Sequence, residues 1–329
     1  MGRPSHTRQL AVWMNGERVG EWRVPGRGPQ EFQYDPAWLS SPQFRPLSLS
    51  LPVGLGAPAK RGEVVTPTTH LFKLPMGRVG SGQIDFSSSV ENEWLCGRIL
   101  RAYGLPMAAS RLASFAGQRC LIVERFDRRL HASGSHWLRL PVEDFCQATG
   151  TPPEQKYENQ GGPGMVAIAA LLAQSAQAAE NLRCFFQAQV LFWMLRAIDG
   201  HAKNFSLFLL PGGSYRLTPL YDVLSAWPVI GKAAGQWPEQ ELRLAMAWHG
   251  SKSHTSNPLQ VQLRHLISTA SRMGLGAEAE ALVADLVART PEVIARVQQE
   301  LTSGFPEPLA VAILDGLKGS AERLKKQLS

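Results

Sequence analysis

Two aspartates and one asparagine lie around a short apolar segment near the middle of the chain. Asp199 and Asn204 are five residues apart, and Asp222 follows 18 residues after Asn204. A carboxylate can accept the proton of an attacking hydroxyl group, and an amide oxygen with a second carboxylate suits the oxygen preference of Mg²⁺. Phosphoryl transfer uses this combination of a base and a metal on the phosphates. The three residues therefore predict a phosphoryl-transfer site.

A predicted hairpin brings these residues together. Residues 205–210 have strand character, residues 211–214 (P-G-G-S) form a turn, and residues 215–220 are a second extended run of equal length. Equal arms return the chain to its starting point, so Asp222 should lie near Asn204. The preceding segment 182–197 is apolar on nearly all sides, which is typical of a buried helix, and it delivers Asp199 from a fixed support. The Asp-to-Asn spacing of five also matches the catalytic loop of protein kinases.

Two side chains that can donate hydrogen bonds follow the first aspartate. His201 and Lys203 lie two and four residues after Asp199, and we predict all three as catalytic residues. An acid at a helix C-terminus opposes the helix dipole, which suggests a purpose for Asp199 beyond local structure. Lys203 could neutralise the transferring phosphate or keep Asp199 ionised.

A lysine stands among apolar residues in the short β-type run T-H-L-F-K-L-P, at Lys73. Such a lysine more often lies on a solvated face, but one that points inward must meet an anion or a carboxylate. Ser88 and Glu91 resemble a capping box that opens a helix over residues 89–103. Glu91 and Glu93 lie in its first turn, where the helix dipole alone would favour acidic side chains. Either carboxylate could also reach Lys73. We assign Glu93 to the nucleotide site.

The remaining pattern predicts a mixed α+β fold. Strands are expected in a hairpin over residues 9–24 with an Asn15-Gly16 turn, and over residues 110–116 and 119–125. Residues 142–146 are expected to open a helix, and residues 151–164 to form a loop rich in Pro, Gly and charge. Further helices are expected over residues 165–180, 241–247, 258–273, 277–289, 291–302 and 307–328.

Composition limits the possible classes. The 329 residues are 44% hydrophobic with a net charge of +7, which allows a substantial core and favours acidic partners such as nucleotides or nucleic acid. The four cysteines form no C-x-x-C pair, and neither G-x-S-x-G nor H-E-x-x-H occurs. The N-terminus lacks a signal-peptide pattern and no apolar run approaches membrane-spanning length, so we expect a cytoplasmic protein without a membrane partner.

Six motifs in order carry a resemblance to a known family. They are T-P-T-T-H-L-F-K-L-P, S-V-E-N-E, V-E-R-F-D-R-R, K-Y-E-x-x-G-G-P-G, I-D-G-H-A-K-N-F-S and G-G-S-Y-R-L-T-P-L-Y-D-V. Together they resemble the HipA-like toxin kinases, which are serine/threonine kinases of bacterial toxin–antitoxin modules. The likeness covers about residues 63–329, with weaker matches in residues 9–24 and 47–53.

The resemblance implies a two-lobed protein-kinase-like fold with a small β-rich N-lobe and a larger helical C-lobe. The expected parts are a shortened N-terminal subdomain (1–56), an N-lobe-like region (57–137) and the helical C-lobe (138–329). ATP and Mg²⁺ are the implied cofactors. The resemblance implies that Lys73 binds the ATP phosphates, that Glu124 and Phe126 belong to the adenine hinge, and that His201 and Tyr221 flank the nucleotide. It also implies that Asp199 is the catalytic aspartate and that Asn204 and Asp222 are the metal ligands.

The same resemblance implies partners. A small helix-turn-helix antitoxin similar to HipB would bind the chain, and their complex would bind operator DNA. The activity typical of the family is phosphorylation of a serine in an aminoacyl-tRNA synthetase.

One segment departs from the family pattern. The family carries a Gly-rich, Ser-containing loop before the lysine strand, whereas here S-L-S-L-P-V-G (48–54) passes almost directly to P-A-K-R-G-E-V-V-T-P-T-T-H (58–70). An internal deletion of that loop is expected, with Gly54-Leu55-Gly56 as a short substitute. The alternative to an active kinase is therefore a weakened or inactive relative that binds antitoxin and operator DNA. Generic nucleic-acid binding has less support, because the basic residues form no stripe.

Overall fold

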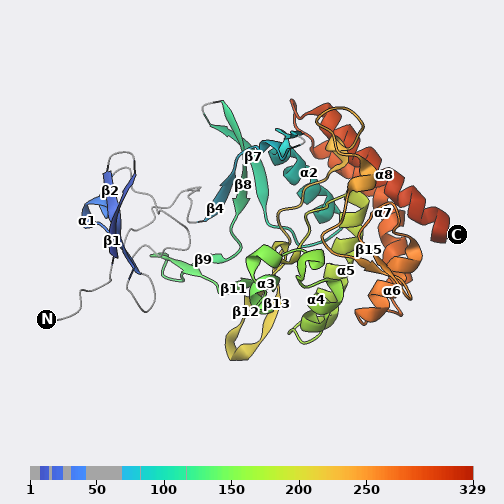
Figure 1. The fold of residues 1–329 in the computed structure, drawn as a ribbon, viewed down its shortest axis with the longest axis horizontal. Helices are drawn as coiled ribbons and strands as arrows, with labels where there is room; N and C mark the ends of the chain where they lie inside the picture. The colour runs from blue at the N-terminus through green and yellow to red at the C-terminus, as the bar shows by residue number, and fades with distance from the viewer. Residues whose placement is uncertain are drawn as a thin grey trace. The chain divides into compact units, whose positions relative to one another are not determined.

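The computed structural model describes residues 8–14, 17–24, 31–41, 69–81, 83–115 and 117–328 (Figure 1). The predicted Asn15-Gly16 turn, the Gly54-Leu55-Gly56 pattern and the whole segment 48–68 lie outside the described residues. The chain divides into two compact units, one formed by Met1–Thr68 with Leu130–Leu138 and one formed by Thr69–Arg129 with Arg139–Ser329.

The first unit contains an antiparallel sheet with strand order β1-β2-β3. Its strands are β1 (Arg8–Met14), β2 (Glu17–Val24) and β3 (Glu31–Tyr34), followed by the short helix α1 (Pro36–Leu39). The predicted pairing within residues 9–24 is confirmed. Val19 and Trp38 are buried, and Asp35 caps α1 by accepting a hydrogen bond from Ala37 N at 2.9 Å.

The second unit begins with a three-stranded antiparallel sheet of order β4-β8-β7. The strands are β4 (His70–Lys73), β7 (Ser110–Phe115) and β8 (Gln118–Glu124), and helix α2 (Ser89–Ala102) packs against β7 and β8. A small hairpin of β5 (Gly77–Val79) and β6 (Ile84–Phe86) precedes α2. The strands and the helix agree with the predicted segments, because the apolar side chains of β8 and α2 share one core: Leu121 and Val123 are buried in the same cluster as Leu95 and Ile99.

The expected capping box at the start of α2 is wrong. Ser88 occupies the N-cap position, but its side chain makes no capping hydrogen bond. The carboxylate of Glu91, which would have reached back to Ser88, instead pairs with Arg119. Glu91 is buried, and a buried carboxylate is costly without a charged partner, so the ion pair determines where Glu91 points.

Helices form most of the remaining part of the second unit. They are α3 (Phe145–Ala148), α4 (Met165–Leu172), α5 (Ala178–Leu195), α6 (Leu263–Arg272), α7 (Ala279–Glu300) and α8 (Glu307–Leu328). Helix α5 runs through the core in contact with α7 and α8 (Figure 1), and Phe185, Leu191 and Met194 on it are fully buried. The predicted burial of this helix is confirmed, although it begins four residues earlier than expected.

Short strands complete the second unit. They are the sheet of β11 (Val142–Asp144), β12 (Ser206–Leu209) and β13 (Tyr215–Leu217), and the pair of β14 (Trp248–His249) and β15 (His254–Thr255). Strand β9 (Arg128–Leu130) pairs with β10 (Trp137–Arg139), and residues 130–138 of this pair belong to the first unit. The hairpin predicted around the site is thus present with shorter arms. A third strand, β11, pairs with it over residues 142–144, and the helix opening expected over residues 142–146 is found at Phe145, where Asp144 caps α3.

Two other expected helices differ. Residues 277–289 and 291–302 form the single helix α7 with Pro291 inside it, because Val283 and Val297 on either side of the proline are both buried in the same core. Residues 241–247 form no α-helix: Glu241 ends a 3₁₀ turn (Glu239–Glu241), and Leu244 N donates to Ser256 O at 2.7 Å. In the described part of the chain, no helix is long and apolar enough to cross a membrane.

Candidate active site

Lys73 lies at the centre of a network of charged side chains in the second unit. Its Nζ donates to both carboxylate oxygens of Glu93, at 2.7 and 2.9 Å, and to Asp222 Oδ1 at 2.6 Å. Strand β4 supplies the lysine and helix α2 supplies Glu93, so the inward-pointing alternative is the one found. Of the two candidate glutamates, Glu93 reaches the lysine and Glu91 does not.

Burial and charge oppose each other in this network. Burial disfavours the charge of Lys73, but the carboxylates of Glu93 and Asp222 outweigh it and raise its pKa above 10.5. Burial raises the pKa of Glu93 to about 7, against the attraction of Lys73. The lysine is therefore held as a cation at neutral pH, while Glu93 is close to its titration point.

Asn204 and Asp222 lie side by side. Asn204 ends a turn of 3₁₀ helix (Ala202–Asn204) and is buried, and its Nδ2 donates to Asp222 Oδ2 at 3.0 Å. Its Oδ1 accepts a hydrogen bond from His201 N at 3.3 Å. Asp222 has a left-handed backbone with φ of 60°, a conformation that costs energy in a residue with a side chain. The β12–β13 hairpin thus brings the two residues together as the equal-arm argument predicted.

Asp199 follows the C-terminal end of α5, where Arg196 takes a left-handed conformation with φ of 52°. The Asp199 side chain is 59% exposed, and its Oδ1 accepts a hydrogen bond from the hydroxyl of Tyr157. His201 is buried, with its Nε2 3.8 Å from the same oxygen. Burial lowers the pKa of His201 against the attraction of Asp199, which favours a neutral ring at pH 7. The exposed carboxylate can accept a proton from an incoming hydroxyl group.

Lys203 points elsewhere. Its Nζ donates to Asp144 Oδ2 at 2.7 Å, and Asp144 also caps α3 by accepting from Gln147 N at 2.9 Å. The sequence suggested Asp199 or a transferring phosphate as the partner of Lys203, whereas in the structure its charge is paired with Asp144. Its ion pair ties the turn that carries Asn204 to β11 and α3.

Aromatic rings lie beside the network. The ring of Phe126 packs against Tyr221 with centroids 5.6 Å apart and against Phe208 at 5.7 Å. The Tyr221 hydroxyl donates to Lys203 O at 2.9 Å and lies 2.6 Å from Ser206 Oγ, so its polar end is satisfied within the protein. Glu124 closes β8 with an exposed side chain, just before Phe126.

Asn204 and Asp222 fit a magnesium ion that also binds phosphates. Mg²⁺ commonly takes one or two protein oxygen ligands and completes its shell with water and substrate phosphates. Asp222 is 41% exposed, so its carboxylate is accessible. Asn204 contacts it through Nδ2, and the Asn204 Oδ1 that would bind the ion accepts a hydrogen bond from His201 N. Among the described residues there is no cluster of three or more His, Cys, Asp or Glu side chains that could hold a metal ion.

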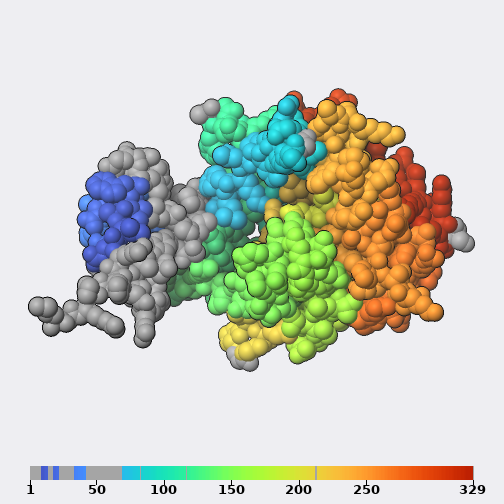
Figure 2. Space-filling model, in the orientation of Figure 1, coloured from blue at the N-terminus to red at the C-terminus, as the bar shows by residue number. Residues whose placement is uncertain are grey.

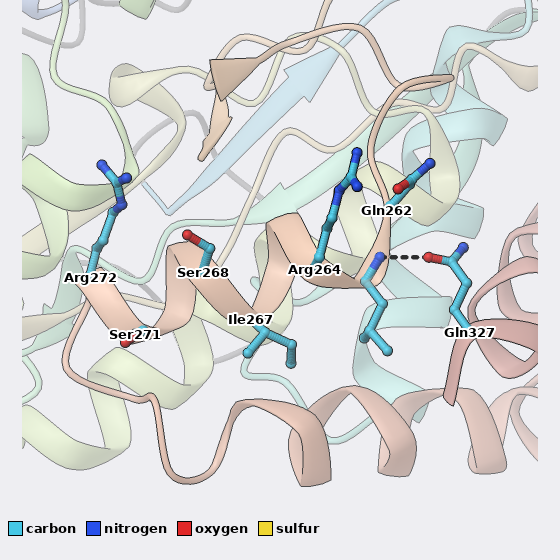
Figure 3. A pocket seen from close by; sticks show the side chains of 8 residues that line it. Gln262, Arg264, Ile267, Ser268, Ser271, Arg272 and Gln327 are labelled. Carbon is cyan, nitrogen blue, oxygen red and sulfur yellow. Dashed lines mark hydrogen bonds between the residues drawn. The ribbon is translucent and has the colours of Figure 1, made fainter. Parts of the chain in front are cut away.

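The surface between the strand region and the helical region of this unit is hollowed in the space-filling view (Figure 2). A separate cavity of about 740 Å³ lies beside α6 (Figure 3). Arg264, Ser268 and Arg272 line it, and Gln327 Oε1 accepts a hydrogen bond from Leu263 N at 2.8 Å. None of the predicted site residues lines this cavity.

Sequence reasoning missed two residues of this site. Tyr157 belongs to the motif K-Y-E-x-x-G-G-P-G, which was quoted for the resemblance without a role, and it contacts Asp199 across 42 positions of sequence. Asp144 was expected at a helix opening, where it does cap α3, but its ion pair with Lys203 was not predicted. A tyrosine and an aspartate in such surroundings have no periodic pattern that would reveal their partners.

Comparisons with known proteins agree on one family. The model of the HipA-like C-terminal domain matches residues 51–294, and that of the HipA N-terminal domain matches residues 10–68. The protein named "Putative kinase Y4mE" of Sinorhizobium fredii is 37% identical over 170 residues, which are 50% of this chain and 38% of that protein. The serine/threonine-protein kinase toxin HipA of Shewanella oneidensis is 30% identical over 171 residues, 48% of this chain and 37% of that protein. The matched part is thus less than half of each relative.

A solved structure shows the same fold. It is the complex of HipA, HipB and operator DNA from Shewanella oneidensis MR-1, which matches with a TM-score of 0.64 at 20% identity and covers 99% of this chain and 66% of that chain. The α+β, kinase-like fold class predicted from the sequence is confirmed. The matched family model spans most of the chain, and the chain therefore belongs to the family of HipA-like C-terminal domains.

Proposed function

We propose that this protein is an ATP-dependent serine/threonine protein kinase and the toxin component of a toxin–antitoxin module. The observation that carries the proposal is the Lys73 network, in which one lysine joins a helix glutamate and the carboxylate beside Asn204. Protein kinases need such a lysine–glutamate ion pair together with a metal-binding aspartate. The sequence resemblance and the family membership support the same activity.

Each residue then has a role in the reaction. Lys73 binds the ATP phosphates, with Glu93 fixing its position, and Phe126 and Tyr221 lie against the adenine, whose hinge includes Glu124. Asn204 and Asp222 hold Mg²⁺, which neutralises charge on the phosphates when bound. Asp199 accepts the proton of the serine hydroxyl. Buried, neutral His201 packs beside Asp199. The ion pair of Lys203 with Asp144 holds the 3₁₀ turn Ala202–Asn204, which we call the catalytic turn.

The test is transfer of label from γ-labelled ATP to a protein serine, with aminoacyl-tRNA synthetases as the first substrates. Asp199→Ala should lower the rate by about 10²–10⁴-fold, as for loss of a general base, and Asp222→Ala should abolish the Mg²⁺-dependent transfer, because it removes a proposed ligand of the metal. Asp315→Ala, which removes an exposed carboxylate from α8, is the matched control. Equal transfer by the wild type, Asp199→Ala and Asp222→Ala would disprove the proposal.

A second measurement separates an active kinase from a non-catalytic binding module. Calorimetry with Mg·ATP should give a Kd for the wild type and none for Lys73→Met. A wild-type chain that binds no nucleotide would favour the alternative of a non-catalytic module, in which the shortened segment before Lys73 has removed nucleotide binding.

The expected partner is a helix-turn-helix antitoxin similar to HipB. The fold match comes from a structure named for a complex of HipA, HipB and operator DNA, which supports this assignment. Co-expression with a neighbouring helix-turn-helix protein should give a complex that shifts its operator DNA on a gel. Failure of the two purified proteins to associate would count against the partner without affecting the kinase assignment.

A further inference from the structure

The exposed carboxylate of Asp199 is held from one side only. The Tyr157 hydroxyl donates to Oδ1, and His201 Nε2 lies 3.8 Å from that same oxygen. Among the described residues, no donor reaches Oδ2. The two rings of Tyr157 and His201 meet edge to face with centroids 5.1 Å apart and planes at 82°, a contact that favours this orientation of the phenol. One oxygen of the carboxylate is fixed and the other is open.

The loop that carries Tyr157 is itself anchored. Lys156 O accepts a hydrogen bond from Ala202 N at 3.4 Å, in the catalytic turn, and Glu158 Oε2 accepts one from Ala247 N at 2.5 Å. Gly162 N closes the loop by donating to Tyr157 O at 2.9 Å. A side chain at Gly162 or Gly164 would overlap Gln155 or Glu158, with a Cβ only 2.3 or 2.4 Å from the nearest atom. The backbone around Tyr157 is therefore a built support rather than a free surface loop.

We propose that Tyr157 is a positioning residue for the phosphoryl-transfer reaction. Its hydroxyl holds Asp199 Oδ1, so that Oδ2 faces the hydroxyl group of the acceptor serine and takes its proton. This inference rests on the proposed kinase function. An incoming serine need not displace the phenol, because more than half of the Asp199 side chain is exposed.

The electrostatics agree with a phenol that donates and does not ionise. Burial raises the pKa of Tyr157 well above 10, and the hydrogen bond to Asp199 and its negative charge raise it further. Lys156 lies with its Nζ 5.0 Å from the centre of the Tyr157 ring, and neutral His201 packs at its edge. Tyr157 therefore remains a hydrogen-bond donor at neutral pH.

A spectroscopic titration tests the contact without relying on activity. In the full chain labelled with ¹³C at the tyrosine ζ carbon, Tyr157→Phe identifies the Tyr157 signal. Asp199→Asn should lower the pKa of Tyr157, because the charge that opposes phenol ionisation is gone. Asp315→Asn, at an exposed site on α8, should leave that pKa unchanged. A Tyr157 pKa that is the same in the wild type and in Asp199→Asn would overturn the proposed contact.

Kinetics test its consequence. Tyr157→Phe keeps the ring against His201 but removes the donor, and should lower kcat roughly 10- to 100-fold, the usual worth of a hydrogen bond to a charged group. The KM for ATP should stay within about two-fold, since Tyr157 contacts the base and not the nucleotide network. Tyr215→Phe is the matched control. The Tyr215 hydroxyl donates to Leu171 O at 2.9 Å, and neither residue belongs to the candidate site.

The possible failures are distinguishable. An unchanged or raised kcat in Tyr157→Phe would overturn the positioning role, and a raised kcat would mean that the phenol blocks the acceptor. A wild-type chain with no transfer activity would instead overturn the proposed kinase function, while the titration would still decide whether Tyr157 holds Asp199.

Discussion

A single lysine determines the electrostatic character of the candidate site. Lys73 is paired with Glu93 and with Asp222, and the two carboxylates come from different parts of the chain. Two carboxylates that share one cation repel each other, and burial adds to the cost of ionising Glu93. The result is a glutamate whose pKa of about 7 lies where cells control pH.

Glu93 should make folding stability fall as pH rises. The unfolded chain releases this proton near pH 4.5, whereas the folded chain keeps it until about pH 7, so the folded state binds more protons between these values. The free energy of unfolding should therefore decrease over this window through Glu93. In Glu93→Gln, the stability relative to wild type should rise between pH 4.5 and 7 and level off above pH 7.

Urea denaturation at several pH values, without metal or nucleotide, measures this difference. The exposed Glu322 on α8 offers the matched control, Glu322→Gln. A stability difference between Glu93→Gln and wild type that falls with pH, or that stays constant, would contradict the prediction.

At the scale of elements, the site depends on irregular segments as much as on helices and strands. Residues 156–164 contain only one turn of 3₁₀ helix (Glu158–Gln160), yet they fix Tyr157 beside Asp199. Their glycines have a physical reason. Gly161 adopts φ of 97°, which favours glycine, and Gly162 lies where backbone atoms leave no room for a side chain.

A methyl group at Gly162 should therefore be costly. Its Cβ would lie 2.3 Å from Gln155 O and 2.9 Å from Tyr157 O, both backbone atoms. Gly162→Ala should destabilise the chain by about 1–3 kcal/mol, as overpacking does, and should weaken the Tyr157–Asp199 contact. Gly319→Ala has open space around its Cβ on α8 and should stabilise the chain by about 0.5–1 kcal/mol. Thermal unfolding of both variants checks the prediction, and equal effects of the two substitutions would contradict it.

The sequence predicted the elements whose signal is local. Helix α8 was predicted with its bounds, and the β12–β13 hairpin with its turn, because apolar periodicity and turn residues specify them. Strand β11 was missed because a strand of three residues is defined by its pairing with β12, more than sixty positions away, rather than by its own pattern. The single helix α7 was divided at Pro291 because the packing that holds it together on both sides of the proline is not visible in the sequence.

The same distinction applies to the site. The pairing of Asn204 with Asp222 follows from the hairpin that joins them, and an inward Lys73 had to find a carboxylate. The choice of Glu93 over Glu91 depended on Arg119, which claims Glu91. Lys203 pairs with Asp144 rather than with Asp199. This pairing could not be predicted, because 59 residues separate the partners and no periodic pattern links them. Sequence reasoning therefore found the residues but not all of their pairings.

At the scale of the whole molecule, every described residue of the site belongs to the unit formed by residues 69–129 and 139–329. Seven separate segments of that unit contribute: β4, α2, residues 124–126 at the end of β8, β11, the loop of residues 156–164, residues 199–204 and residues 221–222. Lys73 and Asp222 are 149 positions apart, so the network exists only in the folded unit. A ligand that binds this network binds the folded state and not the unfolded chain.

Mg·ATP should therefore stabilise the unit by mass action. At a free concentration 100 times its Kd, the gain is about 2.7 kcal/mol, which should raise the Tm of this unit by several degrees. Lys73→Met and Asp222→Asn should lose the shift, because they remove the phosphate and metal contacts. Asp199→Asn should keep it, since Asp199 acts on the acceptor hydroxyl, and should nevertheless lose transfer activity. Thermal unfolding with and without Mg·ATP, with Mg²⁺ alone as the reference, separates nucleotide binding from catalysis. An equal Tm shift in Asp222→Asn and in the wild type would exclude Asp222 from the metal site. No Tm shift in the wild type would indicate a chain that does not bind Mg·ATP.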